Sequence, residues 1–504
     1  ELGFKSIVAE WNNIYSQNLG KFKKEYKSQS IYLKGLSCKL PVIWTDSLIF
    51  QKFQRVIHNE IQSRDYFDFL NNYLVTGSKF FPAYSSDLEV FNYRPGRFGT
   101  EPPLLNDEWN RIKCLLRDCT KKYPIVLPSE VLNGIHSVEI YPFTSKTPIL
   151  VKKQDKYSLS RWSACGWDSV YINTLCSRLL SSFNSKTPEK KWRKLLQYWG
   201  SDYRTHTTKK KWQMAIKYLE KNNSQVALPK NILRPQKDVS KIFQVVDNQL
   251  IFINQGIKIS FLLNKGLALS QISANGSLHP VGTISHGEFS NVEYMADFFT
   301  GSCVLSSPEH GNLSDLNTVE KLKYLRKSEK YFIISCEIQI KTVGIIKKLW
   351  SIDLEKRQLS LLIELHLSNY FLGTIRLGTL TARYNSRPIW YETNNGGKYP
   401  ERYTINEVIN QQAPISLHQS SRSGLGLSKD GTIKLGGNSE AKGVKVCVNL
   451  KRSYPFVMLQ AYSEDILSML RLYFSVQELD DTSKKIIMLP ARYKNKYLAW
   501  SLSL

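Results

Sequence analysis

The sequence predicts a multidomain protein with an α/β segment first, a helical region next and a large antiparallel β-sandwich last. Three observations support this order. The chain has 504 residues, which is too long for one ordinary hydrophobic core. Helix-like and strand-like segments alternate over residues 1–104, and helical periodicity dominates residues 105–240. From residue 241 onward, runs of alternating apolar and polar residues are separated by turn residues, a pattern typical of antiparallel sheet.

The first segment predicts helix, strand, helix and strand in succession. Apolar residues at helical spacing predict a helix over residues 4–26. A short apolar strand is predicted over residues 40–44, followed by an amphipathic helix over residues 47–74, with Ser47 able to cap its first amides. A further strand is predicted to end just before Asp87. This succession is typical of a parallel barrel or a wound sheet.

The predicted strand ends carry polar residues where α/β enzymes keep their chemistry. Asp46 follows the first short strand, and Asp87 follows the next one. Catalytic side chains in such folds lie just past the carboxyl ends of strands. We therefore expect Trp44 and Asp46 to contact a substrate and Asp87 to take part in its chemistry.

The rest of the chain predicts helices and then strands. Helical periodicity occurs at residues 108–119, 158–183, 190–198 and 207–221. Strands are predicted at residues 242–246, 250–253, 257–261, 331–340, 359–365, 373–382, 444–450 and 493–501. So many strands without intervening helices indicate a β-sandwich.

Composition excludes some classes of protein and favours others. The formal net charge is +26, but the Lys and Arg residues are spread along the chain, so we do not expect nucleic acid as the partner. None of the 8 Cys residues forms a Cys-x-x-Cys motif, which predicts reduced core thiols in a cytoplasmic protein and no metal site. No apolar run is long enough for a membrane span. No cofactor is predicted.

Residues 84–98 hold the densest set of special side chains. Asp87 and Glu89 stand close in sequence to Arg94 and Arg97, among several aromatic residues. Aromatic rings stack on the apolar face of a sugar, carboxylates accept its hydroxyls or move protons, and Arg fixes the carboxylates. This combination favours a sugar site. The alternative is a solvated loop with a local ion pair.

Two further segments are candidate binding elements. Residues 199–208 bring Asp202, Arg204 and His206 together before a helix that Thr205 or Thr207 could cap, as a loop reaching into a site or as an elaborate helix cap. Residues 161–168 offer Trp162 and Asp168 as a polar and aromatic cluster, for which the alternative is core packing of Trp.

These segments, in this order, resemble stretches of glycoside hydrolase family 57-like proteins. The resemblance covers about residues 40–440 and includes residues 87–97, 161–176, 199–206, 374–378 and 394–397. It implies an incomplete (β/α) barrel, a helical region and a β-sandwich. The implied domains are residues 1–104 as the C-terminal part of the barrel, residues 105–240 as the helical domain and residues 241–504 as the β-sandwich.

The resemblance also implies a reaction. Family members hydrolyse or transfer α-glycosidic bonds with retention, using a Glu nucleophile and an Asp acid/base. Asp87 matches that Asp. Glu89, Arg94 and Arg97 would then orient the site, and a retaining pair needs carboxyl groups about 5–5.5 Å apart.

The sequence departs from the family before Asp87. Neither the nucleophilic Glu nor its His-x-His-type motif is recognisable there, and the first residue is Glu1 rather than Met, so we expect a processed chain or a piece of a longer one. Two explanations stay open: a second polypeptide supplies the missing strands and Glu, or the chain is a degenerate relative that binds glycan without cleaving it. A third reading is a basic nucleic-acid-binding protein.

Overall fold

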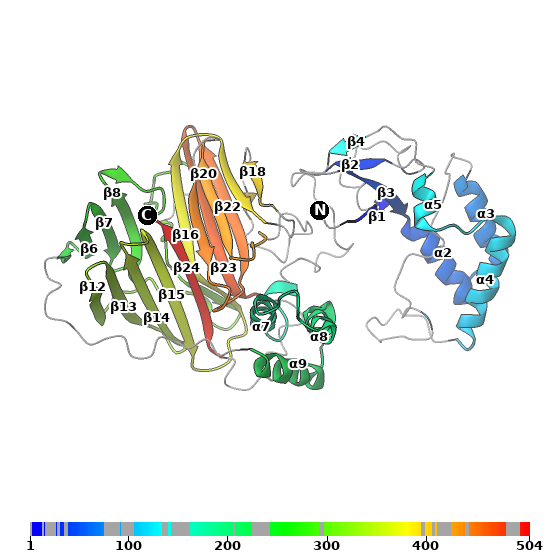
Figure 1. Cartoon of the computed structure of the whole chain (residues 1–504), viewed down its shortest axis with the longest axis horizontal. Coiled ribbons are helices and arrows are strands. Elements are labelled where there is room, and N and C mark those ends of the chain that lie inside the picture. Colours follow the sequence, from blue (N-terminus) through cyan, green and yellow to red (C-terminus); the bar gives the residue numbers. More distant parts are fainter. Residues whose placement is uncertain are drawn as a thin grey trace. The chain divides into compact units, whose positions relative to one another are not determined.

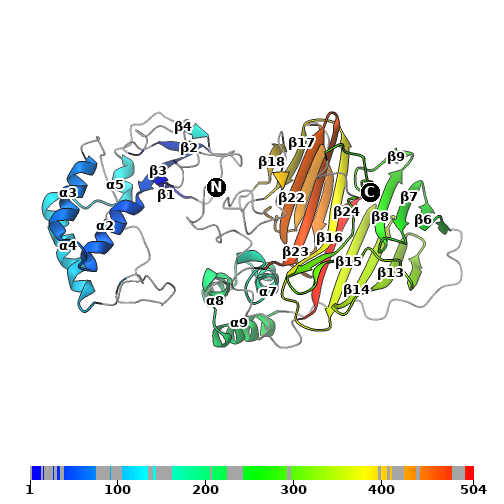
Figure 2. The same ribbon diagram turned by 180° about the vertical axis from the view of Figure 1, so that it is seen from behind.

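The computed structural model of this chain describes residues 3–12, 15, 27, 31–34, 39–74, 91, 105–133, 140–142, 162–204, 207–223, 242–291, 297–394, 399–405, 409–410, 425–438, 443–479 and 494–504. These residues belong to two compact units, 1–153 and 154–504. The two units are shown in Figures 1 and 2.

The first unit contains a four-stranded mixed sheet in the order β1–β3–β2–β4 (Figure 1). β1 (Ile7–Glu10) and β3 (Lys39–Thr45) run parallel, with Glu10 opposite Thr45. β2 (Tyr32–Lys34) pairs with β3 in the antiparallel direction and with β4 (Ile140–Pro142) in the parallel direction. The described strands form an open sheet, and the predicted barrel remnant is not confirmed.

The N-terminal segment corrects the sequence prediction. A helix was expected over residues 4–26, but residues 7–10 form β1. Ile7 and Val8 are β-branched, and a run of three apolar residues fits either structure, so pairing with β3 decides. Trp11 follows the strand and packs edge-on against Trp44, with 5.3 Å between ring centroids.

The described helices of this unit include α2 (Ser47–Ile57), α3 (Ser63–Leu74), α4 (Glu108–Lys122) and α5 (Pro128–Asn133). The single helix predicted over residues 47–74 is two helices, because the chain turns at Asn59, whose φ is 59°. The cap of α2 is Asp46 and not Ser47, as the Leu48 amide donates to its carboxylate at 2.9 Å. α2, α3 and α4 share one apolar core that includes Phe53.

The second unit is dominated by three antiparallel sheets. The nine-stranded sheet has the order β12–β13–β14–β15–β24–β21–β20–β17–β18, the six-stranded sheet β11–β10–β16–β23–β22–β19, and the five-stranded sheet β5–β6–β7–β8–β9 (Figure 2). The strands of the nine-stranded sheet are β12 (Leu322–Ser328), β13 (Tyr331–Ile340), β14 (Gly344–Asp353), β15 (Gln358–Leu367), β24 (Lys496–Ser503), β21 (Val444–Val448), β20 (Thr432–Gly437), β17 (Ile389–Thr393) and β18 (Glu401–Ile405). Those of the other two are β11 (Gly311–Ser314), β10 (Val304–Ser307), β16 (Thr374–Asn385), β23 (Leu467–Gln477), β22 (Phe456–Glu464), β19 (Ile409–Asn410), β5 (Phe243–Val246), β6 (Gln249–Asn254), β7 (Ile257–Leu262), β8 (Ala268–Ala274) and β9 (Ser277–Leu278). The predicted β-sandwich is confirmed.

The alternation read from the sequence fixes which face of each strand is inside. In β15, Leu359, Leu361 and Ile363 are buried, whereas the residues between them are half-buried on the opposite face. The inner residues belong to one apolar core shared by the three sheets. The five-stranded sheet joins that core through Phe261, which packs on Trp350 at 5.2 Å between ring centroids.

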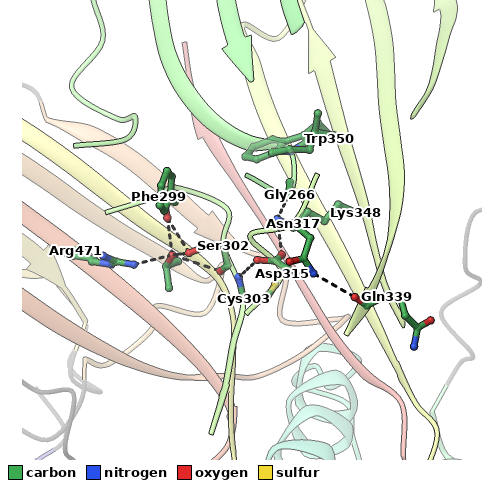
Figure 3. A network of polar contacts seen from close by, with 12 residues as sticks. Gly266, Phe299, Ser302, Cys303, Asp315, Asn317, Gln339, Lys348, Trp350 and Arg471 are labelled. Carbon is green, nitrogen blue, oxygen red and sulfur yellow. Dashed lines mark hydrogen bonds and ion pairs between the residues drawn. The ribbon is translucent and has the colours of Figure 1, made fainter. Parts of the chain in front are cut away.

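A buried ion pair ties the three sheets together (Figure 3). Lys348 Nζ on β14 lies 2.6 Å from Asp315 Oδ2, and neither side chain is exposed. The same ammonium donates to the carbonyl of Gly266, before β8, at 2.6 Å, and the other Asp315 oxygen accepts from the amide of Cys303, before β10, at 2.9 Å. Burial by itself would lower the pKa of Lys348, but the Asp315 carboxylate outweighs it and raises that pKa above its ordinary value.

Three helices pack at one end of the sandwich in both views: α7 (Ser169–Ser181), α8 (Glu189–Trp199) and α9 (Lys209–Lys221). The Thr174 hydroxyl of α7 accepts from the Tyr454 amide at 2.9 Å. The cap of α9 is Thr208, which accepts from the Lys211 amide, and not Thr205 or Thr207.

The helical residues divide between the two units. α4 packs in the first unit, whereas α7, α8 and α9 belong to the second. The observed division at 153/154 therefore groups these helices differently from the predicted boundaries at 104 and 240, which stay predictions. Within the described ranges, no helix combines the length and the apolar character needed to cross a membrane.

Replacing Lys348 with Met should lower the free energy of unfolding of the second unit by about 3–5 kcal/mol, because the buried Asp315 carboxylate loses its partner. Urea unfolding measures this change. The matched control is Lys347→Met at the next position, where the ion pair with Glu337 is exposed and the expected change is within about 1 kcal/mol. Equal effects of the two substitutions would contradict this account of the core.

Candidate functional site

Two carboxylates lie at the carboxyl ends of the parallel strands of the first unit. Glu10 is the last residue of β1, and Asp46 follows the last residue of β3. The parallel register pairs Glu10 with Thr45, so both acids stand at the same edge of the sheet. The Asn12 side-chain amide joins them, donating to Glu10 Oε1 at 3.0 Å and to Asp46 Oδ1 at 3.2 Å.

Asp46 is fully engaged in holding this edge together. Its side chain is 2% exposed and lies 2.5 Å from Lys27 Nζ. The Tyr73 hydroxyl donates to its second oxygen at 3.3 Å, and the Leu48 amide of α2 donates to the first. Burial alone would raise the pKa of Asp46, but Lys27 and the Leu48 amide outweigh it and hold that pKa below its ordinary value. Burial raises the pKa of Tyr73, and the Asp46 carboxylate raises it further.

Glu10 is half-buried and less fully engaged. Its Oε1 accepts from Asn12 and from the Ser47 amide, both at 3.0 Å. Its Oε2 accepts from the Thr45 hydroxyl at 3.1 Å, and that hydroxyl also lies 3.3 Å from the Ala9 carbonyl. A hydroxyl has one hydrogen to donate, so Oε2 is the less saturated oxygen. Among the described residues, Oε1 of Glu10 therefore accepts two hydrogen bonds and Oε2 accepts one.

This arrangement is suited to nucleophilic or general-base chemistry. A reactive carboxylate needs a fixed direction and an oxygen with spare lone pairs, which Glu10 has. Asp46 is buried and accepts from Asn12, Leu48 and Tyr73, which suits a residue that positions its neighbours. Its predicted contact with a substrate stays a prediction. Trp44 is likewise buried at 3% exposure, against Trp11.

The predicted residues of the second unit gather at the start of α7. Asp168 caps this helix, accepting from the Tyr171 amide at 3.1 Å, and pairs with the buried Lys496 at 2.7 Å. Arg204 donates to Asn173 Oδ1 at 2.6 Å and to the Tyr198 carbonyl at 2.6 Å. The Asn173 amide in turn reaches the carbonyl of Trp162 at 3.5 Å.

The described members of this cluster make their contacts within the chain. Arg204 is 3% exposed and Asp168 is 7% exposed, and each has partners within the chain. Burial lowers the pKa of Arg204 while Cys176 opposes the change. Trp162 is half-buried, and Asp202 is exposed in the short 3-10 helix η3 (Ser201–Tyr203). The predicted roles of Trp162, Asp168, Asp202 and Arg204 in binding a substrate stay predictions.

The remaining predicted residues lie outside the described part of the chain. They are Asp87, Glu89, Arg94, Arg97 and His206. Their predicted roles stay predictions.

Residues 374–378, one segment of the family resemblance, make contacts that hold the sandwich together. Gly378 in β16 has φ of 58° at a break in the pairing with β23, and its carbonyl accepts from Trp500 Nε1 at 2.8 Å. A Cβ at this position would lie 2.9 Å from Ile363 Cδ1. Arg376 pairs with the buried Glu478 at 3.0 Å. Residues 374–378 therefore serve the sandwich core.

The candidate site residues predicted from the sequence did not include Glu10. The sequence signal for this residue is a short run of three apolar residues followed by an acid. In α/β enzymes, functional acids often stand at the carboxyl end of a strand. Because residues 4–26 were predicted to form a helix, Glu10 was not recognised as the end of a strand. Among the described residues, no group of three or more His, Cys, Asp or Glu could hold a metal ion.

Comparison with known proteins finds weak structural similarity. No model of a protein family matches the sequence, and no curated protein matches it. Among solved structures, the 4-alpha-glucanotransferase from Thermococcus litoralis aligns at TM-score 0.29 and 11% identity, covering 100% of this chain and 78% of that one. A GH36 alpha-galactosidase from Geobacillus stearothermophilus aligns at TM-score 0.27 and 8% identity, covering 52% of this chain and 40% of that one.

A galactose 1-epimerase from Lactobacillus acidophilus aligns at TM-score 0.26 and 10% identity, covering 52% of this chain and 96% of that one. These neighbours are carbohydrate enzymes. TM-scores this low do not establish a shared fold, and the resemblance to family 57 stays a prediction from the sequence. Nothing in these comparisons supports a second polypeptide.

The lowered pKa of Asp46 predicts a pH dependence of stability. Its usual pKa is 3.8, and the folded value is lower, so the carboxylate stabilises the fold above 3.8 and this contribution is lost as the pH falls through the folded value. The unfolding free energies of the protein and of Asp46→Asn, measured in urea, should differ more at about pH 6 than at about pH 3. Asp68→Asn, at an exposed carboxylate of α3, is the control and should differ little at either pH. A gap for Asp46→Asn that is the same at both pH values would contradict the assignment.

Proposed function

We propose that this chain is a carbohydrate-active enzyme that acts on α-glycosidic bonds with retention, and that Glu10 is its nucleophile. The observation that carries the proposal is the position of Glu10 at the carboxyl end of β1, parallel to β3, with a less saturated oxygen. The ordered sequence motifs support the choice of a sugar substrate. Asp87 is the proposed acid/base.

The proposed reaction has two steps. In the first, a Glu10 oxygen bonds to the anomeric carbon while the glycosidic C–O bond breaks, and the carboxylic acid of Asp87 gives its proton to the leaving oxygen. In the second, the Asp87 carboxylate takes a proton from water or from an acceptor hydroxyl, whose oxygen bonds to the anomeric carbon as the bond to Glu10 breaks. Two displacements at one carbon retain its configuration.

The neighbours of Glu10 support this role. Asn12 and the Ser47 amide hold Oε1, so the carboxylate plane is fixed before substrate arrives. Asp46 supports Glu10 indirectly: it accepts a hydrogen bond from Asn12, which also donates to Glu10, and it pairs with Lys27. With Glu10 as the nucleophile, the proposal needs no second polypeptide to supply that residue.

Glu10→Gln should lower the turnover of α-linked aryl glycosides or α-glucans on the order of 10³-fold or more, because a neutral amide cannot form the glycosyl ester. Initial rates on a panel of such substrates measure this. The control Glu60→Gln, at a partly exposed acid that pairs with Arg55, should keep full turnover.

Unchanged turnover in Glu10→Gln would overturn the assignment of the nucleophile. A protein that binds α-glucans and hydrolyses or transfers none of them would overturn the enzyme proposal in favour of the non-catalytic glycan-binding alternative.

A further inference from the structure

A cavity of about 680 Å³ lies within the second unit, against the face of the nine-stranded sheet that points away from the sandwich core. Its floor is formed by β13, β14, β15, β24 and β21, and its wall by the last turns of α7 together with residues 449–452. The volume is in the range of small-molecule sites.

The floor carries a row of small polar side chains. The sheet register pairs Ser351 with Ser360, Ser360 with Ser501, and Ser501 with Cys447, across four neighbouring strands. Side chains of directly paired residues stand on the same face of a sheet, about 4.5–5.5 Å apart. The row therefore presents three hydroxyls and a thiol to the cavity. Gln358 and Asn449 add amides at its sides.

The cavity is strongly basic. Its lining contains five cationic side chains and a single carboxylate: Arg178, Lys327, Lys429, Lys451, Arg452 and Asp430. Burial lowers the pKa of Arg178; Tyr171 opposes this change, and the like charge of Arg452 adds to it. In the described part of the chain, no carboxylate forms an ion pair with Arg178, Lys429 or Lys451. These three cations therefore stand beside the row of hydroxyls with no carboxylate partner among the described residues.

We propose that this cavity binds an acidic sugar, that is, a hydroxylated ring bearing a carboxylate or phosphate group. The cations match the oxyanion, and the Ser row with its flanking amides matches the ring hydroxyls. Tyr331 offers one half-buried ring at the edge. A single-stranded nucleic acid needs a series of stacking aromatic platforms, which the described lining does not provide.

This inference has two supports that can fail separately. The anionic character of the ligand follows from the cavity alone. Its sugar character rests in part on the proposed function. The cavity is formed entirely by residues of the second unit, so its occupation does not require Glu10.

Calorimetric titration of the whole chain tests the proposal. The probes are trigalacturonic acid and glucose 6-phosphate as acidic sugars, maltotriose as the neutral sugar, inorganic phosphate, and a single-stranded thymidine oligonucleotide. An acidic sugar should bind at least about tenfold more tightly than maltotriose and than phosphate, which corresponds to one charge-assisted hydrogen bond. The two acidic sugars distinguish carboxylate from phosphate as the bound group.

Substitution tests the residues. The double variant Lys429→Gln with Lys451→Gln should weaken binding of the acidic sugar about tenfold or more. The matched control, Lys258→Gln with Lys356→Gln, removes the same charge at two exposed residues outside the cavity and should bind as the unaltered protein does.

Protection of a cysteine from alkylation tests where the ligand binds. Cys447 lies in the floor and is half-buried, whereas Cys114 is exposed in the first unit. The acidic sugar should slow the alkylation of Cys447 by iodoacetamide and leave that of Cys114 unchanged. Protection of neither thiol would overturn the site.

Three other results would overturn the proposal: equal affinity for neutral and acidic sugars, equal affinity for inorganic phosphate, or tighter binding of the oligonucleotide, which would indicate a nucleic-acid site. Glu10→Gln should bind the acidic sugar normally. Loss of turnover in that variant without any binding of acidic sugar defeats only this inference, and binding without any turnover defeats only the proposed function.

Discussion

The candidate site depends on the parallel pairing of β1 with β3. That register sets Glu10 opposite Thr45, and so brings Glu10 beside Asp46 at one edge of the sheet. A slip of one residue would turn the Glu10 side chain to the other face and away from Asn12 and the Ser47 amide. The buried Asp46 secures the register because it caps α2 and binds Lys27 at the same time. The chemistry proposed for Glu10 thus follows from the strand pairing.

In the second unit, three sheets pack on one core. The buried Lys348–Asp315 pair links β14 to the segments before β8 and β10, and an unpaired charge in this place would destabilise the fold. With the inner face fixed in this way, the outer face of the same sheet is free to carry polar side chains. The row of Ser351, Ser360 and Ser501 occupies that outer face.

The sequence predicted most of the second unit and less of the first. Strand alternation is local, so the strand predicted at residues 331–340 coincides with β13. The identity of β1 depends on a partner more than thirty residues away, and its three apolar residues fit helix and strand equally. The contacts of Asp168 and Arg204 are likewise non-local. Their partners include Lys496, which is 328 positions from Asp168, and no spacing in the sequence indicates that contact. Glu10 was missed for the reason that β1 was missed.

The most direct test of the account is to trap the glycosyl ester. The protein would be treated with a 5-fluoro-α-glycosyl fluoride of the sugar that it turns over, digested with pepsin and analysed by mass spectrometry. The account predicts one added glycosyl group on the peptide that contains Glu10, lost on treatment with an acceptor sugar. An adduct on another carboxylate, such as Asp46, or continued turnover with no adduct at all, would contradict it.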